Sequence, residues 1–326
     1  MKHLFKRLSI FILSLVLFGA IASCSSGPDT IHIGQGDWES NEFHDQVVSY
    51  IIEEGYGVET SISSLDTPVI VQSLKTGDVD LNTEIWTDNI PTYRDDIEAG
   101  YYHELSINYD DNMQGIYIPQ YLADEYPGLR SVQDLPDYAS IFPTADGGNK
   151  PVIYGGPSGW EITSFLESKV ESYGLDEYYE FRPLESTATL NATLVDAYNQ
   201  EEAWLGYNWE PTWIMGQLDM YLLEDEVPFD PDRQDEGIGM MPAIEVAVVV
   251  TDGFREEYPE ITAFLTQYQT SSEITSDALS YMEANDASAE ETAIWWLYTH
   301  QEIWTSWVNE DALDSILTEL DNDYDA

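Results

Sequence analysis

The sequence predicts an α/β protein built from two similar lobes. Three features support this prediction: helical and strand-like segments alternate, one unit of helix, turn and strand occurs twice, and two apolar segments rich in β-forming residues lie near one third and three quarters of the chain. We interpret these two segments, 112–118 and 243–250, as strands that cross between the lobes. Lobe one then comprises residues 30–117 plus 244–326, and lobe two comprises residues 118–243.

The first half of lobe one is predicted to contain a strand, two helices and a second strand. The first strand covers residues 31–34, and Ser40 can cap the helix that follows by accepting a hydrogen bond from a first-turn N–H. The second helix begins at Thr67, because Pro68 is accepted in the first turn of a helix. The next strand runs to Trp86, which is therefore expected at a strand end.

The unit of helix, turn and strand returns in lobe two. Ser186 can cap a helix there, and the segment 203–207 has the length and composition of a buried strand. Pro211 cannot continue the hydrogen-bonded ladder, so Trp209 is expected at the carboxyl end of this strand. Trp209 and Trp86 thus occupy matching places, and ligands of open α/β sheets bind at the carboxyl ends of strands.

Two more tryptophans stand beside the ends of predicted elements. Trp160 lies where the glycine-rich turn 155–159 enters a helix, and Trp38 lies in the turn after the first strand. The faces of indole rings attract cations, most strongly where water is excluded. Trp86, Trp160 and Trp209 are therefore the main candidates for a cation-binding box, and Trp38 is a fourth candidate.

Candidate hydrogen-bond donors lie close to these tryptophans. The backbone N–H groups of Gly159, Trp160 and Glu161 are expected at the start of a helix, where an anionic group binds without a formal positive charge. Ser40 marks a second helix start in lobe one, and the hydroxyl group of Tyr207 is a further donor. We expect the polar end of a ligand to bind at these positions.

The C-terminal tryptophans are predicted to be packing residues. A long helix is expected from about Ser288, with apolar side chains at helical spacing along one face. Tryptophans that follow this periodicity face a core. The residues concerned are Trp295, Trp296, Trp304 and Trp307.

Residues 1–23 have the features of a secretory signal peptide. Basic residues precede an apolar stretch that is too short for an ordinary membrane span. The small residues before Cys24 resemble a bacterial lipobox, which implies that Cys24 carries a lipid and that residues 24–30 are a tether to the membrane. The alternative is an unrelated free cysteine. We expect an extracytoplasmic protein, anchored at the cell surface or in the periplasm.

The composition is strongly acidic. The chain has 62 acidic and 11 basic residues, and three basic residues lie in the predicted signal peptide, which leaves a formal charge of −54 on the mature part. Such a field excludes nucleic acids and anionic surfaces as partners. The acidic residues are spread out, and 43% hydrophobic residues suffice for a core, so the chain is not a disordered acidic protein. We interpret the acidic coat as an adaptation to a salty exterior.

No motif in the sequence requires catalysis. The five histidines lack the spacing of a metal site, the segment 156–160 lacks the final glycine of a GxSxG motif, and no phosphate-binding lysine motif is present. We therefore expect no catalytic residues, no metal and no cofactor. Carboxylates are numerous enough for a glycosidase pair, but no two stand out by their context.

Four motifs together resemble one family of transport proteins. They are residues 77–80 leading to Trp86, the turn 155–160, the segment 207–213, and the C-terminal stretches 296–301 and 307–309. On these motifs the mature chain resembles the glycine betaine, proline betaine and choline binding proteins of osmoprotectant ABC importers. The resemblance implies a type II periplasmic-binding-protein fold: two lobes, each a mixed sheet flanked by helices, with two crossover strands as a hinge. It also implies partners, the permease and ATPase subunits of an importer.

The resemblance further implies a ligand. Proteins of this family enclose a quaternary ammonium group in an aromatic box, and the matching residues are Trp86, Trp160 and Trp209. Some members have a histidine after the first of these tryptophans that helps to hold the ligand carboxylate, whereas this chain has Asp88, Asn89 and Ile90 there and no histidine. We expect glycine betaine as the ligand, with choline or another cation as the alternative.

Two other functional classes are open from the sequence. In a secreted carbohydrate-active enzyme, the tryptophans would stack on sugar rings and two glutamates would cleave the bond. In a binding protein for sugars or amino acids, the same lobes would enclose a different ligand. Turnover of oligosaccharides identifies the enzyme, and calorimetry with a small ligand panel separates the two kinds of binding protein.

The charge balance predicts that the folded state needs salt. Repulsion among the acidic groups reaches far at low ionic strength, because the Debye length is about 30 Å at 0.01 M salt and about 3 Å at 1 M. We expect the melting temperature of the mature protein, followed by circular dichroism, to be higher at the second concentration than at the first. A melting temperature that does not rise contradicts this prediction.

Overall fold

The computed structural model describes residues 30–144 and 148–324. The predicted signal peptide 1–23, the lipidation site Cys24 and the tether as far as residue 29 lie outside the described residues. Within the described ranges, no helix is both long enough and apolar enough to cross a membrane.

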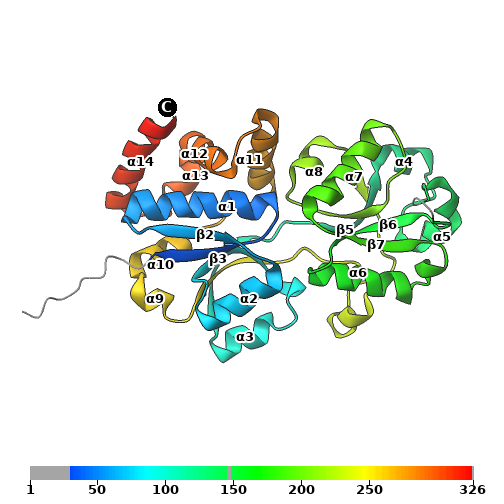
Figure 1. Ribbon diagram of the computed structural model, residues 1–326, viewed down its shortest axis with the longest axis horizontal. Coiled ribbons are helices and arrows are strands. Elements are labelled where there is room, and N and C mark those ends of the chain that lie inside the picture. The colour runs from blue at the N-terminus through cyan, green and yellow to red at the C-terminus, as the bar shows by residue number, and fades with distance from the viewer. Residues whose placement is uncertain (1–29, 145–147, 325–326) are drawn as a thin grey trace, which may run out of the picture.

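The structure has two lobes, each built around a five-stranded mixed sheet (Figure 1). The strands of lobe one are β1 (Ile31–Gln35), β2 (Thr60–Ser64), β3 (Leu81–Trp86), β4 (Tyr102–Tyr109) and β10 (Val246–Thr251), in the order β2-β1-β3-β10-β4. The strands of lobe two are β5 (Gln114–Pro119), β6 (Val152–Pro157), β7 (Glu180–Leu184), β8 (Gly206–Trp209) and β9 (Met220–Leu222), in the order β7-β6-β8-β5-β9. The predicted two-lobed α/β fold is confirmed.

Helices flank both sheets. Those of lobe one are α1 (Glu39–Tyr50), α2 (Thr67–Thr76), α3 (Tyr93–Ala99), α9 (Phe254–Glu257), α10 (Pro259–Leu265), α11 (Ser272–Asn285), α12 (Ala289–Thr299), α13 (Gln301–Trp304) and α14 (Glu310–Tyr324). Those of lobe two are α4 (Gln120–Glu125), α5 (Leu135–Tyr138), α6 (Glu161–Ser172), α7 (Thr187–Asn199) and α8 (Trp213–Gln217).

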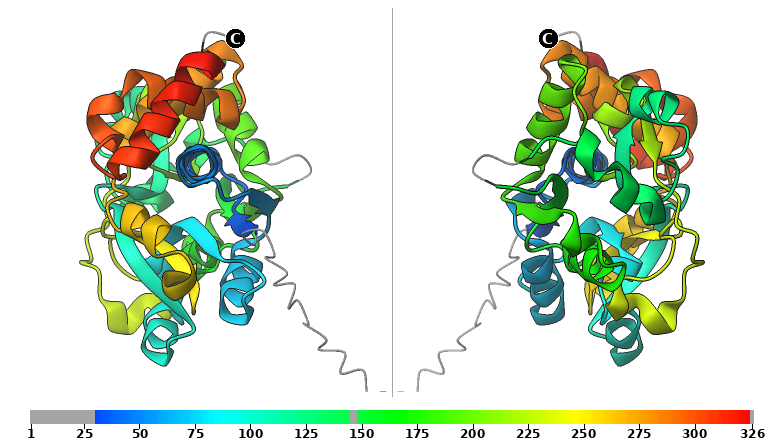
Figure 2. Two further views of the ribbon diagram at one scale, coloured as in Figure 1. Left: turned by 90° about the vertical axis from the view of Figure 1, so that its left-hand side faces the viewer. Right: turned by 90° about the vertical axis from the view of Figure 1, so that its right-hand side faces the viewer.

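The sheet of lobe one is buried on both faces. Alternate residues of β10 point to opposite sides: Val248 and Val250 pack in the cluster with α1, α11, α12 and α14, whereas Ala247 and Val249 pack in the cluster with α2 and α3. Figure 2 shows the C-terminal helices, in orange and red, on the same side of the sheet as α1. In lobe two, α6 and α7 cover opposite faces (Figure 1).

Several helix ends follow the predicted capping residues. Pro68 lies in the first turn of α2, and Gly77 ends this helix with a φ of 76°, a left-handed conformation that glycine adopts without strain. Ser186 caps α7 by accepting a hydrogen bond from the N–H of Thr189. These caps confirm the expected starts of both repeated units.

The predicted long C-terminal helix is wrong in one respect. It begins as expected, because the hydroxyl group of Ser288 accepts a hydrogen bond from the N–H of Glu291, but it breaks at His300 into α12 and α13. The indole N–H of Trp304 donates to the carbonyl oxygen of Leu297 at 2.7 Å and so ties the two helices together across the break. Trp296, Trp304 and Trp307 are buried, as expected of packing residues, and Trp295 stacks on Tyr281.

The two sheets repeat one arrangement. In lobe one, β2, β1 and β3 are parallel and β10 is antiparallel to β3; in lobe two, β7, β6 and β8 are parallel and β5 is antiparallel to β8. The strand β3 with Trp86 therefore corresponds to β8 with Trp209. The sequence placed these two strands in matching units, and the topology confirms this.

The first lobe boundary lies earlier than predicted. All of β5 pairs with β8 and β9 in lobe two, so residues 114–117, which the sequence assigned to lobe one, belong to lobe two. The chain changes lobes between the end of β4 and the start of β5. Each predicted crossing strand therefore belongs to a single sheet, and the chain crosses between the lobes just before that strand. The sequence did not reveal this, because an apolar β-forming segment has the same composition in either role.

One side chain holds the two crossings together. Asn112 lies in the first crossing and Ile244 in the second, and both are buried. The amide nitrogen Nδ2 of Asn112 donates to the carbonyl oxygen of Ile244 at 2.6 Å, and the N–H of Ile244 donates to Oδ1 of Asn112 at 3.0 Å. This pair of hydrogen bonds ties the two connections to each other at the predicted hinge.

Candidate functional site

A pocket lies between the two lobes. Two tryptophans from each lobe line it: Trp38, Trp86, Trp160 and Trp209. The structure thus brings all four predicted box residues into one pocket.

The four tryptophans occupy two pairs of equivalent positions. Trp38 follows β1 and is the N-cap of α1, and Trp160 follows β6 and is the N-cap of α6. Trp86 and Trp209 are the last residues of β3 and β8. Because these strands are parallel within each sheet, their carboxyl ends meet at one edge, and the edges of the two lobes border the same pocket.

The aromatic rings contact one another across the lobe border. Trp38 and Trp160 meet edge to face with centroids 5.6 Å apart, and Trp160 meets Trp209 in the same way at 5.2 Å. Tyr207 stacks on Trp209 at 5.5 Å. Although Trp38 belongs to lobe one, it is 6% exposed and packs in the hydrophobic cluster of lobe two. The aromatic wall is therefore continuous between the lobes.

A buried carboxylate, Glu84, orients the box. Glu84 and Trp86 are two positions apart in β3, so both side chains face the pocket. The indole N–H of Trp38 donates to Oε2 of Glu84 at 2.6 Å, and the hydroxyl group of Ser40 donates to Oε1 at 2.8 Å. The hydroxyl group of Tyr109 donates to Oε1 in a short hydrogen bond. Hydrogen bonds to an ionised acceptor are stronger than neutral ones, so Glu84 holds these three side chains firmly.

The environment of Glu84 suits a positively charged ligand. Burial raises the pKa of Glu84 to about 7, and the hydrogen bonds from Tyr109, Ser40 and Trp38 act in the opposite direction. Near neutral pH, the carboxyl group is therefore partly ionised. A cation bound beside it favours the ionised form and lowers its pKa.

Three of the expected donors already have partners within the protein. Ser40 lies inside the first turn of α1, not at its cap, and its hydroxyl group is bonded to Glu84. Tyr207 lines the pocket, but its hydroxyl group donates to a side-chain amide oxygen of β5 at 3.1 Å. The N–H of Trp160 donates to the carbonyl oxygen of Pro157 at 3.0 Å. The predicted role of Ser40 as a helix cap is therefore wrong.

The start of α6 is the part of the pocket that suits an acceptor group. Glu161 and Ile162, the first two residues of α6, line the pocket, and no side chain in the described part of the chain caps this helix. The N-terminal end of a helix attracts negative charge through its dipole and its first-turn N–H groups. Gly159 precedes the helix but is not among the residues that line the pocket.

Several lining residues were missed in the sequence. Asn82 alternates with Glu84 and Trp86 along β3, and this spacing of two could have identified it. Asn89, three positions after Trp86, also lines the pocket. The approach of α2 to the pocket has no local signal in the sequence. The other missed residues are Thr67, Ile70, Ile85, Ile90 and Ile162.

The titratable residues of the described chain do not form a metal centre, since no three histidine, cysteine, aspartate or glutamate side chains converge there.

A buried ion pair in lobe two, Lys169 with Asp225, serves the fold. Lys169 also donates to the carbonyl oxygen of Gly239 at 2.9 Å, and Asp225 accepts from the hydroxyl group of Tyr173 at 3.0 Å. These contacts fasten the segment 225–239 to α6.

Comparison with known proteins agrees with this geometry. The family described as the substrate binding domain of ABC-type glycine betaine transport systems matches residues 29–299. A trimethylamine N-oxide-binding protein of Pelagibacter ubique (strain HTCC1062) is 22% identical over 314 residues, which are 94% of this chain and 99% of that protein.

Two solved structures share the fold. A glycine betaine, L-proline-binding protein of an ABC transporter from Borrelia burgdorferi has a TM-score of 0.72 and 20% identity, covering 88% of this chain and 99% of that one. An ABC-transporter choline binding protein in complex with choline has a TM-score of 0.71 and 20% identity, covering 89% of this chain and 98% of that one. The family match spans all four pocket tryptophans, and the family consists of extracytoplasmic receptors of ABC importers. The chain therefore belongs to the family of substrate-binding domains of ABC-type glycine betaine transport systems.

Proposed function

We propose that this receptor binds a small molecule with a trimethylammonium head in the box of four tryptophans and delivers it to an importer permease. The observation behind this proposal is that four indoles and the buried Glu84, which accepts a hydrogen bond from one of them, line the same pocket. A trimethylammonium group has no N–H to donate, so ring faces select it where hydrogen bonds cannot. Each ring contributes roughly 0.5–2 kcal/mol. Four rings therefore supply much of the approximately 8 kcal/mol that micromolar affinity requires.

The charge of the pocket favours a ligand with a net positive charge. Glu84 and Glu161 line the pocket, and none of the described lining residues is a lysine or arginine. A hydroxyl group on the ligand can donate to a carboxylate, whereas a carboxylate on the ligand is repelled by both glutamates. Choline combines the trimethylammonium head with a hydroxyl group. We propose choline as the first ligand to test.

Glycine betaine, which the sequence favoured, is the second candidate. The start of α6 at Glu161 and Ile162 supports it, because helix N-termini hold carboxylates. The relatives named above are binding proteins for trimethylamine N-oxide, for glycine betaine and L-proline, and for choline. Of these compounds, trimethylamine N-oxide, glycine betaine and choline each carry three methyl groups on one nitrogen. The box would then be common to these ligands, and the polar end would distinguish them.

We also propose that the mature protein is anchored to the membrane by a lipid on Cys24 and works in a salty exterior. The small residues before Cys24 and the formal charge of −54 on the mature part support this. We expect the full-length protein, expressed in a bacterial host, to incorporate a labelled fatty acid and to lose the label in the Cys24→Ser variant. A wild-type protein that takes up no label contradicts the anchor.

Alanine substitution at Trp86, Trp160 or Trp209 is expected to weaken binding at least tenfold in each case, or about 1.4 kcal/mol. Each substitution removes one ring from the box. Calorimetry would use whichever of choline, glycine betaine and trimethylamine N-oxide binds the wild type most tightly. Trp295→Ala is a matched control, because Trp295 stacks on Tyr281 outside the box. Wild-type affinity in all three folded box variants would refute the proposed box.

The affinity for choline is expected to rise as the pH increases from about 6 to about 8. Glu84 ionises across this range because its pKa is about 7, and the ionised carboxylate attracts the cationic head. Glycine betaine should gain less, since the same carboxylate repels its own. Glu84→Gln should remove most of the rise. If choline affinity does not change with pH, or changes equally in the glutamine variant, Glu84 is not the counter-charge of the ligand.

A further inference from the structure

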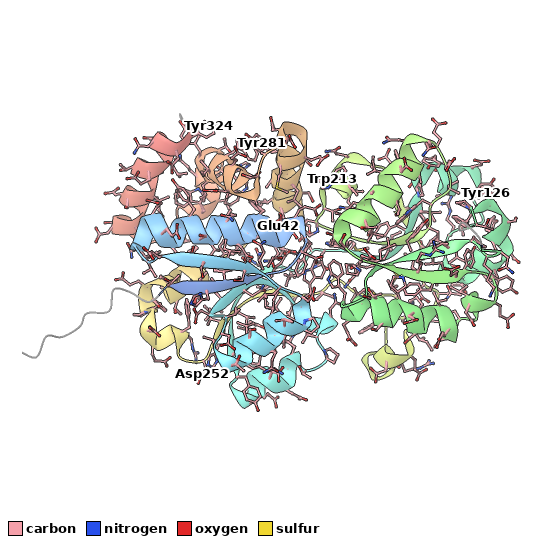
Figure 3. The ribbon with its side chains drawn as sticks, viewed as in Figure 1. Glu42, Tyr126, Trp213, Asp252, Tyr281 and Tyr324 are labelled. Atoms are coloured by element: carbon pink, nitrogen blue, oxygen red, sulfur yellow. The ribbon has the colours of Figure 1, made fainter. Side chains whose placement is uncertain are left out.

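The turn before α1 reaches from lobe one into lobe two. Trp38 lies in this turn, packs in the cluster of lobe two and lines the pocket. Its chain neighbours, Asp37 and Glu39, therefore lie at the border between the lobes. Figure 1 shows one end of α1 directed at lobe two, and Figure 3 labels Glu42 at that end.

Both chain neighbours of Trp38 accept hydrogen bonds from α7 of lobe two. The hydroxyl group of Thr187 donates to the backbone oxygen of Asp37 at 2.7 Å, and Nδ2 of Asn191 donates to Oε1 of Glu39 at 3.2 Å. Thr187 and Asn191 are four positions apart, so they lie on one face of α7. Both are buried, although they face the border between the lobes.

Two tryptophans of lobe two strengthen these contacts. The indole of Trp160, a box residue, lowers the pKa of Asp37, and that of Trp213 lowers the pKa of Glu39, so each indole lies close to the carboxylate concerned. Trp213 packs against the hydrophobic clusters of both lobes, and Figure 3 shows it at their border. Each acidic residue beside Trp38 thus lies close to a tryptophan of lobe two as well as to α7.

Glu39 is partly buried at the contact between the lobes. Burial is the largest cause of the raised pKa of Glu39, and the carboxylates of Glu42 and Glu283 raise it further. A carboxylate buried near other carboxylates is costly unless donors replace the lost water. Here lobe two supplies one side-chain donor, Asn191, to Oε1 of Glu39, while the buried Oε2 accepts no hydrogen bond in the described part of the chain. The hydrogen bond from α7 therefore offsets part of the cost of burying Glu39 between the lobes, and losing it would leave the carboxylate without a side-chain donor.

We propose that residues 37–39 form a latch that holds the two lobes together around a bound ligand, with Thr187 and Asn191 as the receiving residues. This inference rests on the proposed function, because Trp38 is part of both the latch and the box. Glu39 and Asn191 do not line the pocket, so they are positioning residues. A latch that forms after the ligand has entered slows its release more than it changes its entry.

The latch is tested by ligand release kinetics. The probe is whichever of choline, glycine betaine and trimethylamine N-oxide binds the wild type most tightly, followed by stopped-flow tryptophan fluorescence. We expect Glu39→Ala and Asn191→Ala each to raise the dissociation rate about fivefold or more with an association rate within about twofold of wild type. The double variant should be no worse than the worse single variant, because the two residues share one contact.

Two controls separate the latch from a general loss of structure. Glu39→Gln keeps an oxygen that can accept from Asn191 and should release ligand within about threefold of the wild-type rate. Asn199→Ala removes an exposed asparagine from the end of the same helix and should have no effect. If Asn191→Ala does not fold, Thr187→Val replaces it, since valine keeps the shape of threonine and lacks the hydroxyl group.

A second measurement needs no ligand. We expect small-angle scattering of the ligand-free protein to show a larger radius of gyration for Glu39→Ala and Asn191→Ala, but not for Trp209→Ala, which alters the box alone. If no probe binds the wild type, the proposed function fails and scattering alone decides the latch. An increase in the dissociation rate or the radius of both alanine variants that is not additive in the double variant supports the latch. Unchanged values of both in the two alanine variants, or effects that add fully in the double variant, overturn it.

Discussion

The buried carboxylate of Glu84 must be satisfied by hydrogen bonds, and much of the pocket depends on how this is done. A buried carboxylate without partners costs several kcal/mol, so its donors are held in place. Two donors, Trp38 and Ser40, lie at the start of α1, and the third, Tyr109, is the last residue of β4 before the first crossing. One acidic group therefore orients a ring of the box, the first turn of a helix and the end of the strand that leads into lobe two.

The two lobes use the same local design for their half of the box. In each lobe, one tryptophan is the N-cap of the helix that follows β1 or β6. A second tryptophan is the last residue of the neighbouring parallel strand, β3 or β8. In both lobes the residue after the N-cap tryptophan is a glutamate, Glu39 or Glu161. Their surroundings differ: Glu39 contacts α7, while Glu161 lines the pocket. A repeated backbone arrangement thus supports two different tasks.

The acidic surface and the box act on a cation in different ways. The field of a chain with this charge attracts every cation, and salt screens it over a few ångströms. Attraction of this kind cannot distinguish a methylated ammonium group from sodium. Four indole rings can, because a compact ion keeps its tightly held water, whereas a methylated cation exchanges weakly held water for ring faces. In the proposed function, selectivity would therefore come from the box and not from the surface charge.

The sequence by itself determined the features that depend on neighbouring residues: the caps at Ser186 and Ser288, the helix end at Gly77, and the placing of four tryptophans beside element ends. Local sterics and short-range hydrogen bonds decide these features. Only the tertiary structure decided which polar groups face the ligand. The hydroxyl group of Ser40 bonds to a carboxylate 44 residues away, and that of Tyr207 bonds to an amide 93 residues away.

The lobe boundary and the missed lining residues have the same cause. The apolar pattern of β5 is identical whether the strand crosses between lobes or belongs to one sheet, and its pairing with β8 and β9 settles which is the case. Glu84 could be placed on the face of Trp86 from its spacing, but its burial depends on α1 and β4. Periodicity assigns a side chain to a face of its own strand, and only packing between distant segments determines what that face meets.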